Sequence, residues 1–129
     1  MNKSMDRNEL NKLSNKIIGI SIEIHKKIGP GFAEKIYQRI LEIELQKHGF
    51  IVEREKRIFV MWDNEQMGYQ IVDFLIDNEI ILEIKVTSEL NTLHQAQLLS
   101  YLKAANKKLG LLLNFGEGIL IPKRVVNNF

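Results

Sequence analysis

The stretch that decides the fold reads Ile71-Val72-Asp73-Phe74-Leu75-Ile76, then Asp77-Asn78-Glu79, then Ile80-Ile81-Leu82-Glu83-Ile84-Lys85-Val86. Two apolar, largely β-branched runs flank three polar residues, which is the pattern of an antiparallel β-hairpin with a three-residue loop. Charged side chains inside such runs are costly to bury unless they are paired. Asp73, Glu83 and Lys85 are therefore the candidate functional residues of this hairpin.

The length of the loop decides whether the two carboxylates meet. With a three-residue loop, Ile76 pairs with Ile80. Asp73 then falls opposite Glu83, with the two Cβ atoms about 5 Å apart on one face. A two-residue loop would shift the register by one residue and separate the two side chains across the sheet. Two facing carboxylates repel unless a cation lies between them, and oxygen ligands favour a hard ion such as Mg²⁺ or Mn²⁺.

Lys85 is the single basic residue between Ile58 and Tyr101, a stretch that contains 7 acidic residues. It shares a strand face with Glu83 because strand side chains alternate. The spacing alone leaves two interpretations open. Lys85 either orients a water molecule and steadies a phosphate beside a metal ion, or it forms an ordinary salt bridge with Asp73 or Glu83 on a solvated face.

The remainder of the chain predicts an α/β domain with the element order αα-ββββ-α-ββ. Apolar residues recur every three or four positions from Leu10 to Ile28, and Gly29-Pro30-Gly31 ends this first helix. The other expected elements are a helix over Ala33–His48, strands at Ile51–Val52 and Ile58–Trp62, a helix from Thr92 to Asn106 with a Thr92–Gln95 capping box, and strands at Leu109–Phe115 and Ile119–Ile121. The run Leu109–Phe115 is apolar almost throughout, which indicates a strand buried on both faces.

The composition excludes several classes of protein. With 129 residues, 45% hydrophobic and 26% charged, the chain is expected to form one globular domain over 1–129. Its apolar runs are far shorter than the roughly 20 residues of a membrane span, and its polar start is unlike a signal peptide. The chain has no cysteine, which excludes disulfides and thiolate metal ligands and indicates the cytoplasm. His25 and His48 are expected at helix surfaces or ends, so a zinc site is not expected.

The chain also carries three short motifs: D…(D/E)xK at Asp73 and Glu83-Ile84-Lys85, G-x-x-E-x-x-Y at Gly31–Tyr37, and QxxxY at Gln97–Tyr101. Over roughly Leu13 to Asn127, the chain resembles the GxxExxY proteins of the PD-(D/E)XK nuclease superfamily, with the motifs in the same order. This resemblance implies a restriction-endonuclease-like fold, in which helices flank a mixed β-sheet. It also implies a metal-dependent nuclease that hydrolyses phosphodiester bonds in DNA.

The resemblance assigns roles to residues of the hairpin. It implies that Asp73, Glu83 and the backbone carbonyl of Ile84 hold Mg²⁺ (or Mn²⁺), and that Lys85 assists the attacking water. A cut through both strands of a duplex needs two such sites, so a homodimer is expected for that activity. Two rival functions stay open: a nucleic-acid-binding or accessory module that keeps the metal site without efficient turnover, and a metal-stabilised interaction protein with no nucleic-acid role.

The resemblance also assigns residues on the predicted helices. Glu34 resembles the acidic residue of the first helix, which reaches the site directly or through water. Gln97 and Tyr101 resemble the pair that positions the substrate strand, and their i, i+4 spacing places them on one helix face. Tyr37 shares a face with Glu34 and is a candidate substrate contact, with a position in the core as the alternative.

Overall fold

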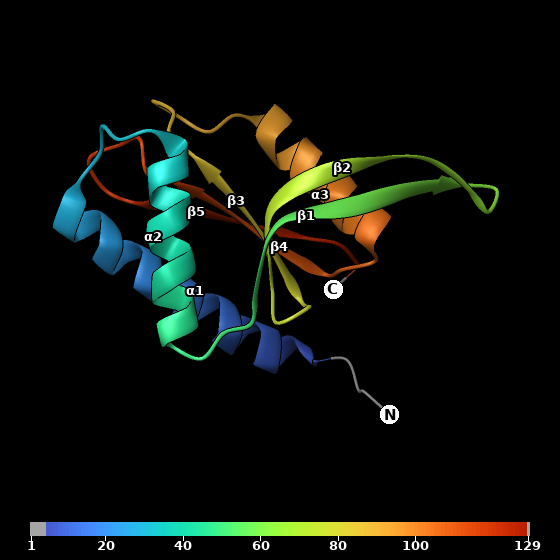
Figure 1. Ribbon diagram of the computed structural model, residues 1–129, viewed down its shortest axis with the longest axis horizontal. Helices are drawn as coiled ribbons and strands as arrows, with labels where there is room; N and C mark the ends of the chain where they lie inside the picture. Colours follow the sequence, from blue (N-terminus) through green and yellow to red (C-terminus); the bar gives the residue numbers. More distant parts are fainter. Residues whose placement is uncertain (1–4, 129) are drawn as a thin grey trace.

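The computed structural model describes residues 5–128; residues 1–4 and 129, which the predicted domain of 1–129 includes, lie outside the described part. The elements, in chain order, are α1 (Arg7–Ile28), α2 (Glu34–Lys47), β1 (Val52–Trp62), β2 (Glu65–Ile76), β3 (Ile80–Lys85), α3 (Thr92–Ala105), β4 (Leu109–Asn114) and β5 (Ile121–Val126). They form the restriction-endonuclease-like α/β fold that the sequence predicts, with helices around a mixed sheet (Figure 1).

The five strands lie side by side in the order β1-β2-β3-β4-β5. Only β3 and β4 are parallel, and α3 makes the crossover that a parallel pair requires. β4 is buried along its whole length, and so is β3 from Ile80 to Ile84, which confirms the prediction for Leu109–Phe115. These two strands form the centre of the molecule because apolar side chains cover both of their faces.

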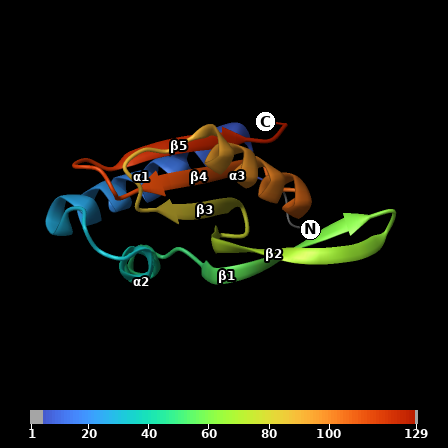
Figure 2. The ribbon, with the colours of Figure 1, turned by 90° about the horizontal axis from the view of Figure 1, so that it is seen from above.

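Helices cover the two faces of the sheet separately. α1 and α2 pack on one face against side chains such as Phe74, Leu82 and Leu111. α3 packs on the other face against Ile81 and Leu112, and Figure 2 shows α1 and α3 on opposite sides of β4. The alternation of strand side chains therefore places Glu83, two residues after Ile81, on the α3 face.

The hairpin of β1 and β2 extends well beyond the rest of the sheet as a two-stranded arm (Figures 1 and 2). β2 pairs with β3 only at its last three positions, Phe74 to Ile76, whereas it pairs with β1 along most of its length. At the tip of the arm, beside the polar turn at Asp63 and Asn64, the side chain of Trp62 is 71% exposed. The side chain of Trp62 is therefore not part of the core.

The arm turns relative to the sheet at Glu55 and Asp73. The ladder between β1 and β2 omits this one pair, and Glu55 has φ +53°, in the left-handed region that residues other than glycine rarely adopt. Val72 and Leu75 both belong to the hydrophobic cluster on the α3 side of the sheet, although strict alternation would place residues three apart on opposite faces. The strand therefore rotates between them, which directs the arm along α3.

The structure corrects three of the predicted element boundaries. Instead of two strands at Ile51–Val52 and Ile58–Trp62, β1 is one continuous strand, so the order is αα-βββ-α-ββ. The N-cap of α3 is Asn91, whose side chain accepts from the amide of His94, in place of a Thr92–Gln95 capping box. The last strand begins at Ile121, where the predicted strand Ile119–Ile121 ends.

We expect that Glu55→Gly stabilises the protein. Glycine adopts a positive φ without the steric cost of a Cβ atom, so the free energy of unfolding should rise by about 1 kcal/mol. Glu55→Ala is the control, because it removes the exposed ion pair with Lys35 (3.6 Å) but keeps the Cβ atom. Urea unfolding measures both variants, and equal stability of the two would contradict strain at this position.

Candidate metal-binding and catalytic site

The candidate site lies at the fork where β2 separates from β3. The register confirms the predicted three-residue loop, since Ile76 pairs with Ile80, and the ladder ends at Phe74 and Leu82. At the next position, Asp73 and Glu83, the two strands form no backbone pair, and the side-chain carboxylates accept hydrogen bonds from backbone amides instead. The amide of Asp73 donates to Oε2 of Glu83 (2.8 Å), and the amide of Ile84 donates to Oδ2 of Asp73 (2.7 Å).

These reciprocal hydrogen bonds hold the two carboxyl groups side by side in a partly buried position. Glu83 is 6% exposed, and burial together with the negative charge of Asp73 raises its pKa to about 8. The hydrogen bond from the Asp73 amide and the charge of Lys85 oppose this rise only partly. Glu83 therefore holds a proton near neutral pH when no cation is bound, because two adjacent anions are unfavourable there.

Glu34 and Lys85 complete the charged group. Glu34 lies in the first turn of α2, where burial and the charge of Asp73 raise its pKa while Lys85 lowers it. No ion pair in the described part of the chain includes Lys85, which speaks against the ordinary salt bridge with Asp73 or Glu83. The fold thus brings Glu34, Asp73, Glu83 and Lys85 into one electrostatic environment.

The α3 face adds Gln97 and Tyr101. Tyr101 is 7% exposed, and burial, followed by the charges of Glu83 and Asp73, raises the pKa of its phenol. The phenol therefore keeps its proton at neutral pH. Gln97 is exposed one helical turn before it, and the two residues line one cavity between α3 and the arm.

The donor set of the fork is two carboxylates beside a strand backbone. Within residues 5–128, no group of three or more histidine, aspartate or glutamate side chains is close enough together to hold a metal ion. All available ligand atoms at the fork are oxygens, and burial together with the negative charge of Asp73 raises the pKa of Glu83. Both properties fit a hard divalent cation and do not fit a soft metal.

A family model that describes the PD-(D/E)XK nuclease superfamily matches residues 11–126. The chain belongs to the PD-(D/E)XK nuclease superfamily. Members of this superfamily are nucleases that generally use divalent metal ions, which agrees with the oxygen ligands at the fork. No curated protein and no solved structure matches the chain. No helix among the described residues is long and apolar enough to cross a membrane.

Tyr37, predicted as a substrate contact of the nuclease site, lies apart from the charged group. It is fully buried, and its ring stacks on Phe115 with 4.6 Å between the ring centroids. Its hydroxyl donates to the carbonyl of Gly29 (2.6 Å) and accepts from the amide of Phe32 (3.3 Å). This position favours the alternative, a core residue that fixes the loop before α2 and with it the place of Glu34.

Sequence reasoning missed two buried polar residues near the site. His25 lies in the last turn of α1, so its expected place at a helix end is confirmed, but it is buried, and its Nε2 donates to the carbonyl of Phe115 (3.1 Å). Asn114 ends β4, accepts from the amide of Thr87 (3.1 Å) and donates to the Thr87 carbonyl (3.0 Å). This two-point contact holds the chain directly after Lys85. A polar residue at the end of an otherwise apolar run is the signal that points to Asn114.

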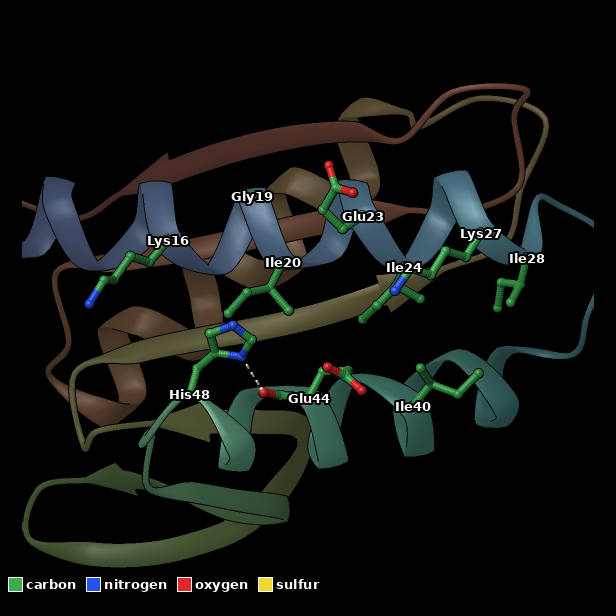
Figure 3. Close-up of a pocket in the computed structure, with 10 residues that line it drawn as sticks. All are labelled: Lys16, Gly19, Ile20, Glu23, Ile24, Lys27, Ile28, Ile40, Glu44 and His48. Carbon is green, nitrogen blue, oxygen red and sulfur yellow. Dashed lines mark hydrogen bonds between the residues drawn. The ribbon is translucent and has the colours of Figure 1, made fainter.

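A separate cavity of about 460 Å³ lies between α1 and α2 (Figure 3). Charged residues of both helices line it, among them Lys16 and Lys27 of α1 and Glu44 of α2. Nδ1 of His48 donates to the Glu44 carbonyl (2.8 Å) at its edge. None of the predicted site residues lines this cavity, so it is distinct from the nuclease site.

We expect the metal-free protein to lose stability as the pH rises. The pKa of Glu83 is about 8 in the folded chain against 4.5 without the fold, so the folded state binds more protons between these values. The stability contributed by protonated Glu83 is complete below about pH 4.5 and is lost by about pH 8. In EDTA, the free energy of unfolding should fall over this interval by on the order of 2 kcal/mol.

Glu83→Gln is the control for this pH dependence, because the amide keeps the size of the side chain and does not titrate. Chemical unfolding at several pH values measures both proteins. If the free energy of unfolding of Glu83→Gln falls with pH as much as that of the wild type, groups other than Glu83 cause the loss of stability.

Proposed function

We propose that the protein is a divalent-metal-dependent nuclease that hydrolyses phosphodiester bonds in DNA. The reciprocal pair of Asp73 and Glu83 at the fork, next to Lys85, is the observation that supports this function most directly. The Gly31–Tyr37 motif further supports a place among the GxxExxY proteins. The choice of DNA rests on the resemblance to that family.

Asp73, Glu83 and the backbone carbonyl of Ile84 are the proposed ligands of Mg²⁺ (or Mn²⁺). The amide of Ile84 points to the side that β2 has left, where it meets Asp73. The carbonyl of a strand residue points to the same side as its amide, so the Ile84 carbonyl is directed to the fork as a third oxygen. A divalent cation held there polarises the phosphodiester group and increases the acidity of water.

Lys85 and Glu34 are proposed to act beside the ligands. The Lys85 ammonium is half-buried on the face of Glu83, where it steadies the negative charge that develops on the phosphate and orients the attacking water. Glu34 reaches the same environment from α2 and accepts a hydrogen bond, directly or through water. Gln97 and Tyr101 position the substrate strand from α3.

Lys85→Ala should reduce cleavage without unfolding the domain. Removal of one electrostatic group that acts in the transition state commonly lowers kcat by about 10²–10³-fold. Lys85→Arg should restore the rate only in part, because the guanidinium is larger and does not give up its proton. The assay uses labelled single- and double-stranded DNA and RNA with Mg²⁺, Mn²⁺ or EDTA.

Asp73→Asn is the matched variant for the metal site. Calorimetric titration should show that it weakens Mn²⁺ binding, whereas Lys85→Ala leaves Mn²⁺ binding intact. If Lys85→Ala cleaves at the wild-type rate, the proposed role of Lys85 is wrong. If the wild type binds Mn²⁺ and nucleic acid without cleaving, an accessory module becomes the better description.

We also propose that two copies associate through the outer face of the arm, the face turned away from α3. Phe59, Met61, Tyr69 and Ile71 follow one another there, each about half exposed (46–55%). Aromatic side chains bury about 150–250 Å² each, so two half-exposed aromatic and two half-exposed aliphatic side chains offer roughly 400 Å² per copy. Two such faces cover about 800 Å², less than the roughly 1,200 Å² of stable interfaces, so the dimer should be weak.

Sedimentation over a concentration series tests this association. The wild type should shift from monomer towards dimer as its concentration rises, whereas Phe59→Thr with Ile71→Thr should remain monomeric. Trp62→Thr is the control, because Trp62 is an exposed apolar side chain on the alternate face of the same strand. A monomeric wild type at all concentrations would exclude this interface.

A further inference from the structure

A half-open cavity of about 300 Å³ lies between the arm and α3. Its lining residues come from both elements: Val60 and Gln70 from the arm, and Gln97, Ser100, Tyr101 and Ala104 from α3. It exists because the arm turns at Glu55 and runs along α3 (Figure 1). Val60, Gln70 and Ala104 lie outside the three motifs, and Ser100 fills one of the unspecified positions of QxxxY.

Several polar groups of this cavity are free to bind a ligand. The side-chain amides of Gln70 and Gln97 and the hydroxyl of Tyr101 form no hydrogen bond within the described part of the chain. The hydroxyl of Ser100 donates to the carbonyl of Ala96 (3.1 Å) and keeps its capacity to accept. The side chain of Tyr101 is largely buried, but its hydroxyl oxygen is not fully buried, so a ligand in the cavity can reach it.

The cavity adjoins the candidate metal site. Tyr101 lines the cavity and lies within the electrostatic influence of Glu83 and Asp73. A group bound against Tyr101 is therefore next to the carboxylates. A ligand of the cavity can therefore belong to the same nucleic-acid strand as a phosphate at the fork.

The chemistry of the lining distinguishes a base from a phosphate. Of the described residues, none that lines the cavity carries a charge, so the cavity is not built for a phosphate. Val60, Ala104 and the ring of Tyr101 offer apolar surface, while the glutamine amides can both donate and accept, as the edge of a base requires. The volume holds about ten water-sized groups, close to the number of non-hydrogen atoms in a nucleobase.

We propose that this cavity binds an unpaired nucleobase of the substrate strand, next to the phosphate that is cleaved. The inference rests on the proposed function and narrows its substrate to single-stranded or frayed nucleic acid. A base inside a duplex is stacked and paired, and it cannot enter the cavity without leaving the helix. A blunt, stable duplex is therefore a poor substrate.

The test compares Val60→Trp, whose indole fills the cavity, with Phe59→Trp, whose indole lies on the outer face of the same strand. Stacking of one base on an aromatic side chain is commonly worth 1–3 kcal/mol, so Val60→Trp should raise KM for a single-stranded oligonucleotide about tenfold. Fluorescence anisotropy with the same oligonucleotide measures binding independently of cleavage. Gln70→Leu, with Gln66→Leu as its control, repeats the test if Val60→Trp does not fold.

An abasic nucleotide identifies the bound base. With wild type, one abasic position beside the cleaved phosphate should raise KM about as much as Val60→Trp does, and the two changes together should add nothing further. Equal KM for Val60→Trp and Phe59→Trp, or equal cleavage of a blunt duplex and a single strand, overturns the inference. Binding that is lost in Val60→Trp without any cleavage by wild type supports the cavity and overturns the proposed nuclease function instead.

Discussion

The separation of β2 from β3 at Asp73 is the constraint on which the site depends. Where two strands part, their backbone amides lose their partners, and a buried amide without a partner is costly. Here the carboxylates of Glu83 and Asp73 accept from the Asp73 and Ile84 amides in place of the missing strand. The same two side chains thus complete the hydrogen bonding of the fork and present their remaining oxygens to the site.

The adjacent carboxyl groups of Asp73 and Glu83 repel each other, and the packing of the surrounding fold offsets this cost. Burial of two adjacent carboxyl groups raises the pKa of Glu83, and the only nearby compensation within residues 5–128 is Lys85 and the amide hydrogen bonds. β3 and β4 are packed on both faces, and the Asn114–Thr87 contact holds the chain after Lys85. The surrounding structure therefore holds the two carboxyl groups side by side despite this cost, and a bound cation would lower it.

The sequence predicts the fork well because its determinants are local. Alternation of apolar residues and the length of the Asp77–Glu79 loop are enough to place Asp73 opposite Glu83. The helical spacing of Gln97 and Tyr101 is local in the same way. The burial of His25 is harder to predict, since its partner, the Phe115 carbonyl, is 90 residues away, although Ile17, Ser21 and His25 do share one helix face.

The sequence does not predict that β1 continues through Glu55. The backbone of Glu55 is left-handed, and glutamate, unlike glycine, does not indicate such a conformation. Yet the conformation of Glu55 has a clear consequence for the site. A strand of regular alternation would place Val72 and Leu75 on opposite faces, and the arm would leave the sheet without following α3. The rotation at Glu55 and Asp73 brings Val60 and Gln70 over Gln97 and Tyr101, so the bend that forms the fork also forms the wall of the cavity beside it.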